Sequence, residues 1–128
     1  MKYSIALLLT VLSSTSALAS EKCQYGGTPD AFKFISWEFK KVDNRWTDIK
    51  LKFKNTLEQN VSWADVLIEV GGHSFGLRVR ELVKAGGEGI AADQLGMPQK
   101  DADMFAPMTP VICVHALRDE KDNLKRFD

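Results

Sequence analysis

This 128-residue sequence has few histidines and cysteines and no net charge. It has two histidines and two cysteines, and its 17 basic and 17 acidic residues cancel. A neutral chain has no overall field to attract DNA, RNA or anionic lipid, so no nucleic-acid partner is expected. The carboxylates Glu58, Asp65, Glu69 and Glu81 are expected to be solvated. The sequence therefore predicts that the protein is not an enzyme.

Long hydrophobic runs are absent except near the start. Ile5 to Leu12 is apolar apart from Thr10, follows the positive Lys2, and precedes the small-x-small pattern Ala17-Leu18-Ala19. This order is typical of a secretory signal peptide, and the run is shorter than a membrane span. We expect cleavage after Ala19, which leaves residues 20–128 in a periplasmic or secreted form. The alternatives are a buried helix or an uncleaved anchor. No later segment is long and apolar enough to span a membrane.

Cys23 and Cys113 are the only cysteines, and they lie 113 − 23 = 90 positions apart. In an oxidising compartment an isolated pair most often forms a disulfide. Closing that loop stabilises the fold by ~4 kcal/mol in the chain-entropy model. We expect the bond to clamp an N-terminal strand to the last strand. The alternative is two independent thiols.

Strict alternation of apolar and polar residues marks the first strands. In Thr47–Lys54, one face carries Ile49, Leu51 and Phe53 and the other carries lysines. Ala31–Val42 alternates too, with Ile35, Trp37 and Phe39 expected to point inward. Asp43-Asn44 supplies turn residues between the two segments, which predicts a hairpin.

A second hairpin is predicted around Gly71-Gly72, because tight hairpin turns need positive φ. Val61–Val70 precedes it, and a change of parity between Trp63 and Val66 indicates a bulge or burial on both faces. His73–Leu82 follows it. Phe75, Leu77 and Val79 are expected to point inward, and Arg78 and Arg80 outward.

The pattern weakens after Val83. Gly86–Gly89 is expected to be a loop, Ile90–Leu95 a short strand or helical turn, and Met97–Asp101 a connection. Val111–Leu117 is continuously apolar, which is typical of a central strand. The charged residues after Leu117 are expected to form a frayed tail or a short surface helix, so the domain is expected to span residues 20–118 and the tail 119–128.

Short strands joined by turns predict an all-β fold, a β-sandwich or small barrel. The segment IKLKFKNTLEQNVSWADVLIEV, followed by a glycine hairpin, resembles immunoglobulin-like domains of bacterial envelope proteins, the FxLYD type in particular. The resemblance covers residues 35–79 and rests mainly on Phe53-Lys54-Asn55. The later tyrosine-bearing signature of the family is not recognisable. The resemblance implies an immunoglobulin-like antiparallel sandwich that acts as a binding or scaffolding module, with no catalytic residues.

Two binding surfaces are candidates. The first combines outward-pointing cations and an aromatic residue, and the second is the loop region from Gly86 to Pro110. The residues of the first are Lys50, Lys52, Lys54, Arg78, Arg80 and Trp46. Cations on a strand usually only solvate it, but they also suit an acidic protein or an anionic envelope polymer. Inhibition of a secreted hydrolase is a variant of this function.

Metal binding is the main alternative. His73, His115, Met104 and Met108 offer imidazole and thioether ligands, which suit copper. Met104 and Met108 are otherwise expected to fill gaps in the core. His115 shares a strand face with Cys113, a pair that would suit a cysteine nucleophile, but a disulfide would remove that function.

Overall fold

The computed structural model describes residues 22–43 and 46–128, and for residues 93–96 the backbone alone. The predicted signal peptide over residues 1–19 and Asn44 of the first predicted turn lie outside the described residues. The elements are β1 (Phe32–Lys41), β2 (Trp46–Asn55), β3 (Val61–Val70), β4 (His73–Val79), β5 (Glu88–Pro98), α2 (Gln99–Phe105), β6 (Val111–Asp119) and β7 (Leu124–Arg126). The fold is therefore all-β and antiparallel, as predicted, with one short helix among the described residues.

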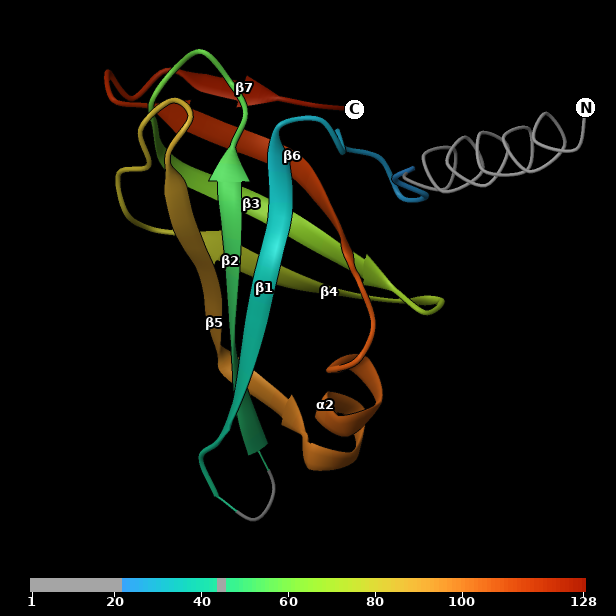
Figure 1. The fold of residues 1–128 in the computed structure, drawn as a ribbon. Helices are drawn as coiled ribbons and strands as arrows, with labels where there is room; N and C mark the ends of the chain where they lie inside the picture. The colour runs from blue at the N-terminus through green and yellow to red at the C-terminus, as the bar shows by residue number, and fades with distance from the viewer. Residues whose placement is uncertain (1–21, 44–45) are drawn as a thin grey trace, which may run out of the picture.

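The strands form one sheet in the order β1-β2-β5-β4-β3-β6-β7. Its two halves, β1-β2-β5 and β4-β3-β6-β7, meet at a single residue pair, Arg78 opposite Ala92. In Figure 1, β3, β4 and β6 cross behind β1, β2 and β5. Buried side chains from both halves form one core. None of the helices in the described part of the chain is long and apolar enough to cross a membrane.

The β2 strand follows its predicted alternation. Thr47, Ile49, Leu51 and Phe53 are all at most 4% exposed, whereas the lysines between them are exposed. The Phe53 ring stacks on Phe32 of β1, with the ring centroids 4.2 Å apart. This confirms the strand and places β2 at the centre of its half of the sheet.

The inward face of β1 differs from the prediction at one residue. Ile35 is 42% exposed, because the register with β2 shifts between Phe34 and Ser36. A bulge adds one residue and so reverses the parity of side chains across it. Phe34 lies inward before the bulge, and Trp37 and Phe39 after it, packed against the core. The hairpin between β1 and β2 is confirmed by nine residue pairs.

The second hairpin, β3–β4, is also confirmed. Gly71 and Gly72 have φ of +54° and +81°, the positive values that the tight turn requires. The parity change in β3 lies earlier than predicted, at the register shift between Val61 and Trp63, because Val61 and Ala64 are both buried. The second shift, between Asp65 and Val66, adds its extra residue, His115, to β6. The β4 strand ends at Val79, three residues earlier than predicted, and Leu82 is 53% exposed.

The region after Gly86 contains more regular structure than predicted. The loop Gly86–Gly89 is short, because β5 already begins at Glu88 and continues for 11 residues. Residues 99–101, predicted as a connection, begin α2. The predicted central strand is confirmed as β6, which lies between β3 and β7. The predicted tail or surface helix is wrong, since Leu124–Arg126 pairs with β6 as β7.

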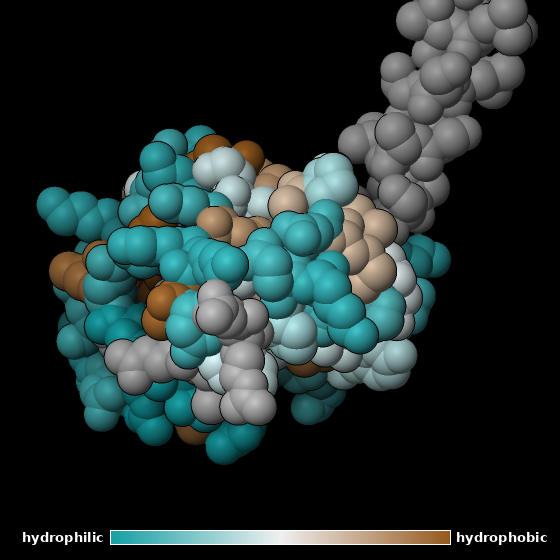
Figure 2. All heavy atoms as spheres, turned by 90° about the horizontal axis from the view of Figure 1, so that it is seen from below, coloured by the Kyte–Doolittle hydropathy of each residue, from teal (hydrophilic) through white to brown (hydrophobic). Residues whose placement is uncertain are grey.

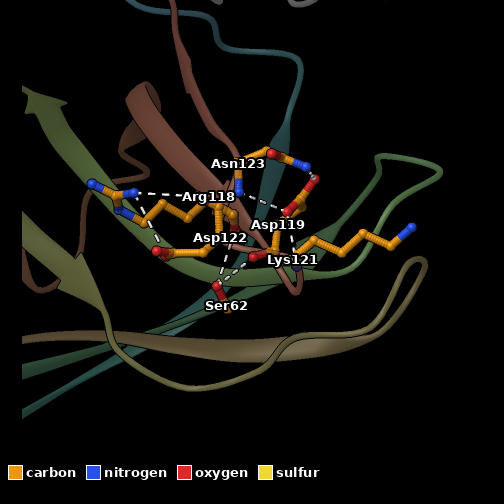
Figure 3. A network of polar contacts seen from close by, with 6 residues as sticks. All are labelled: Ser62, Arg118, Asp119, Lys121, Asp122 and Asn123. Atoms are coloured by element: carbon orange, nitrogen blue, oxygen red, sulfur yellow. Dashed lines mark hydrogen bonds and ion pairs between the residues drawn. The ribbon is translucent and has the colours of Figure 1, made fainter.

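The turn between β6 and β7 is organised by the Asp119 carboxylate (Figure 3). It accepts hydrogen bonds from the backbone N–H groups of Lys121 and Asn123, each at 2.9 Å, and from the Asn123 side chain at 3.0 Å. These bonds favour the charged form, and the largest contribution, from the Asn123 backbone, lowers the pKa of Asp119. Ser62 on β3 donates to the Asp119 carbonyl at 2.7 Å, which ties the turn to the sheet.

Acid is expected to loosen this turn selectively. Because the pKa of Asp119 is lower in the folded chain, its stabilising contribution is present above the unfolded-state pKa of about 4 and is lost as the pH falls through the folded-state pKa. Amide resonances of Lys121 and Asn123 should therefore move together below pH 4 in an NMR titration. Asp119→Asn should remove this step, and an unchanged step in that variant would contradict the assignment.

Candidate functional site

Three of the predicted cations meet in one open groove on the outer surface of the sheet. Lys50 comes from β2, and Arg78 and Arg80 lie on or just after β4. The groove has a volume of about 470 Å³. Its lining is Asp48, Ile49, Lys50, Arg78, Arg80, Glu81, Ile90 and Ala92. This set is called the basic groove below.

Strand register explains why these residues meet. Ala92 of β5 pairs with Lys50 on one side and with Arg78 on the other, so the two cations flank a small side chain. Residues two apart on an extended chain share a face, which places Arg80 beside Arg78. The methyl group of Ala92 fills little space between long side chains. The groove therefore lies where the two halves of the sheet join.

A side chain replaces strand pairing beside the groove. Beyond the pair of Arg78 with Ala92, β4 and β5 form no further residue pair. The Ile90 N–H instead donates to the Glu81 carboxylate, at 3.0 Å. The groove lining combines three cations and two carboxylates with the apolar residues Ile49, Ile90 and Ala92.

Two of the groove cations carry no ion pair to the side chains that the structure describes. Arg78 lies 3.9 Å from the Asp65 carboxylate, a contact between exposed groups that contributes little. Within residues 22–43 and 46–128, Lys50 and Arg80 form no ion pair, although Asp48 and Glu81 line the same groove. These two side chains are thus available to an anionic group from outside.

The other predicted contact residues lie outside the basic groove. Lys52 pairs with Glu88 at 3.7 Å, and Lys54 stands opposite Glu88 in the register. Trp46 is 44% exposed and lies opposite Pro98, at the far end of β2. In the view from below, hydrophobic residues appear as small separate patches between hydrophilic ones (Figure 2).

The predicted copper ligands are divided between two places. His73 begins β4, and its ring contacts Phe105 of α2 with centroids 5.4 Å apart. Met108 lies near the same end, with its Sδ next to Gly71. Met104 and Met108 are each 38% exposed, so the expected role as core filler is wrong.

His115 lies elsewhere, on β6. His73 pairs with Val70, whereas His115 lies beside the bulge at Asp65 and Val66. The two histidines are thus about 15 Å apart along the strands, with β3 between them. The His115 ring contacts Gly27, and its Nε2 is buried without a hydrogen-bond partner among the described residues. The structure does not bring the two histidines together.

Residues Gly72–Gly76 have the Gly-x-Ser-x-Gly spacing of a hydrolase nucleophile elbow. An elbow requires a sharp turn from a strand into a helix. Here Ser74 lies inside β4, opposite Glu69, and the next element is another strand. No hydrogen bond joins Ser74 to a histidine among the described residues. This local geometry is not that of an elbow.

The disulfide Cys23–Cys113 is present, which confirms the pairing. Its predicted role needs correction, because Cys23 lies in an irregular segment and Cys113 is in the middle of the interior strand β6. The bond fixes the segment before β1 onto the sheet. Thr28 extends this attachment by pairing with Val114.

Glu69 is the residue that sequence reasoning missed. It was expected in solvent but is only 9% exposed. Its carboxylate accepts hydrogen bonds from the backbone N–H groups of Gln24, at 2.8 Å, and Tyr25, at 3.3 Å. The signal for it was weak, since a single glutamate near the end of a strand normally faces water.

Comparison of the chain with protein-family models, curated proteins and solved structures gave no match.

Proposed function

We propose that the chain is an exported, non-catalytic binding module that recognises an anionic partner through the basic groove. The carrying observation is that Lys50 and Arg80, in one groove with Arg78, have no ion pair among the described residues. Arginine and lysine side chains attract carboxylate and phosphate groups. The apolar residues Ile90 and Ala92 in the lining would accommodate the aliphatic part of such a partner.

An immunoglobulin-like sandwich is the proposed frame. The strand order supports this proposal, because the sets β1-β2-β5 and β4-β3-β6-β7 match the order of strands A-B-E and C′-C-F-G in such sandwiches, with no D strand among the described residues. The FxLYD-type relationship remains a prediction. Rigid sandwiches commonly present binding surfaces without catalytic groups, which agrees with the proposed module.

Export is supported by the disulfide, because such bonds persist mainly in oxidising compartments. The partner is then an acidic segment of an exported protein or an anionic envelope polymer. Inhibition of a secreted hydrolase would use the same groove against an acidic surface.

Mapping by NMR tests the location of the site. Poly-L-glutamate and polyphosphate are added in turn to the ¹⁵N-labelled protein, and poly-L-lysine serves as the control of opposite charge. We expect the amides of Lys50, Arg78 and Ala92 to shift with at least one polyanion and not with poly-L-lysine. The polymer with the larger effect identifies carboxylate or phosphate as the preferred group. Shifts confined to other surfaces, or none, would contradict the proposal.

A further inference from the structure

Cys23, Glu69 and Cys113 form a cluster of possible metal ligands. One donor atom from each residue lies within 4.8 Å of the other two. In the part of the chain that the structure describes, no other group of three or more histidine, cysteine, aspartate or glutamate residues meets this distance. The predicted copper set shares none of these three residues.

Three separate segments build the cluster. Glu69 lies near the end of β3, and Cys113 lies on the neighbouring β6, opposite Leu67. Because Leu67 and Glu69 are two residues apart on one strand, Glu69 and Cys113 share a face of the sheet. Cys23 lies over this face, with its Cα 5.8 Å from that of Cys113.

The Glu69 carboxylate is held in place beside the sulfur atoms. Its Oε2 is 3.4 Å from the Cys113 Sγ, and the N–H groups of Gln24 and Tyr25 fix its orientation. Cys113 is fully buried, while Cys23 is partly exposed. The three side chains therefore offer two sulfur donors and one oxygen donor to a metal ion.

We propose that reduction of the disulfide converts this cluster into a binding site for one zinc-class divalent cation, held by the thiolates of Cys23 and Cys113 and the carboxylate of Glu69. Zinc accepts both sulfur and oxygen ligands in tetrahedral geometry, whereas magnesium and calcium require oxygen ligands. Donor atoms of one tetrahedral zinc lie about 3.5 to 4 Å apart. Small side-chain movements therefore bring the three donors to zinc-binding distances.

The fourth ligand is water. A pocket of about 390 Å³ reaches Glu69 from the surface, between Tyr25, the β3–β4 turn and Pro110. Catalytic zinc sites likewise combine three protein ligands with one water molecule. The pocket also provides the entry path that the ion needs.

Metal binding at this site depends on whether the two cysteines are reduced or joined in the disulfide. A phosphine reductant and one water molecule convert the disulfide into two thiols, and the phosphine becomes its oxide. Zinc then replaces two thiol protons, which are released to solvent. A disulfide-forming oxidant that accepts two electrons from the thiolates restores the S–S bond and expels the ion.

Electrostatics favour the bound ion in the reduced chain. Two thiolates beside a carboxylate would place three negative charges within a few ångströms of one another. Like charges at that distance repel one another, so the three charged donors are unfavourable together without a cation. A divalent cation neutralises two of the three charges.

Native mass spectrometry with zinc tests the site directly. The wild-type chain is compared after phosphine reduction and in the disulfide form, together with Cys23→Ser, Glu69→Gln and the control Glu58→Gln. We expect one zinc per reduced wild-type chain, with loss of two protons, and none in the oxidised chain or in Cys23→Ser. Glu69→Gln should weaken binding by at least about 10- to 100-fold, because losing even an outer partner of a metal ligand costs that much. Glu58→Gln should match wild type. Equal affinity of Glu69→Gln and wild type, or zinc on the oxidised chain, would overturn the proposal.

Cobalt absorbance distinguishes a folded site from unfolded thiols. Co²⁺ in the reduced wild-type chain should give the visible bands of a tetrahedral ion and thiolate charge-transfer bands, both altered by Glu69→Gln. If reduction unfolds the chain and cobalt does not restore its far-ultraviolet circular dichroism, the ion binds cysteines of an unfolded chain. That outcome would also overturn the proposal.

Discussion

Leu51→Asp is expected to unfold the protein, whereas Lys52→Asp is expected to leave it folded. Leu51 is fully buried at the centre of β2, and Lys52 is exposed on the opposite face. An unpaired carboxylate in the core, together with the lost leucine, costs on the order of 5 to 10 kcal/mol, which is comparable to the roughly 5 to 15 kcal/mol stability of a typical domain. Circular dichroism during thermal unfolding measures both effects.

Lys52→Asp is the matched control, because it introduces the same residue one position along. It replaces an exposed ion pair with Glu88 by a repulsion between two exposed carboxylates, and each of these effects amounts to at most about 1 kcal/mol. A shift of β2 by one residue would exchange the two faces of the strand. Similar damage from both variants would therefore contradict the register.

Removal of the disulfide gives the second large effect. The bond closes a loop with a sequence separation of 90, so replacing both cysteines by serine is expected to cost about 4 kcal/mol in the chain-entropy model. For a domain of this size that corresponds to a fall in melting temperature on the order of 15 °C. Differential scanning calorimetry of the Cys23→Ser/Cys113→Ser variant measures the change.

The contribution of the Glu69 hydrogen bonds can be separated from that of the disulfide. Glu69→Ala leaves the disulfide intact but removes the acceptor for the N–H groups of Gln24 and Tyr25. It should loosen the segment before β1 and lower the melting temperature by much less than the double serine variant. An unchanged melting temperature in the serine variant would show that the bond does not limit stability.

Strands with one solvent-exposed face were predictable from sequence, because the alternation of apolar and polar residues directly indicates which side chains are buried. The β2 strand and the β3–β4 hairpin follow this rule, and the two turn glycines mark the hairpin. The bulge in β1 was not predictable, since Phe34, Ile35 and Trp37 are all apolar and give no parity signal. Tertiary packing decides which of them turns outward.

The later elements depend on contacts that no local pattern records. The turn before β7 is held by the Asp119 side chain, within a segment whose charge is typical of a tail. Asn55 is fully buried, although asparagine is normally exposed. Its side chain donates to the carbonyls of Gln59, Val83 and Lys84 and accepts from the Leu57 N–H, so it holds together the loops after β2 and β4.

The candidate sites were predictable in part for the same reason. Outward positions for Lys50, Arg78 and Arg80 follow from alternation, but their meeting depends on the pairing of β2 and β4 with β5. The cluster of Glu69 with the cysteines depends on where the segment before β1 crosses the sheet. Neither long-range arrangement leaves a local pattern in the sequence.

The affinity of Arg80→Glu for the polyanion that the NMR mapping selects tests the central claim most directly. Arg80 is exposed and lies in the basic groove. The control variant is Lys84→Glu, which makes the same change in net charge at an exposed position outside the groove lining. Isothermal titration calorimetry at one fixed salt concentration should show a loss of about tenfold or more for Arg80→Glu, the effect of losing a charge-assisted contact. Lys84→Glu should change the affinity less than about twofold, since screened charges outside the site contribute little. Equal losses in the two variants would show that net charge rather than the groove attracts the polyanion, and would contradict the account.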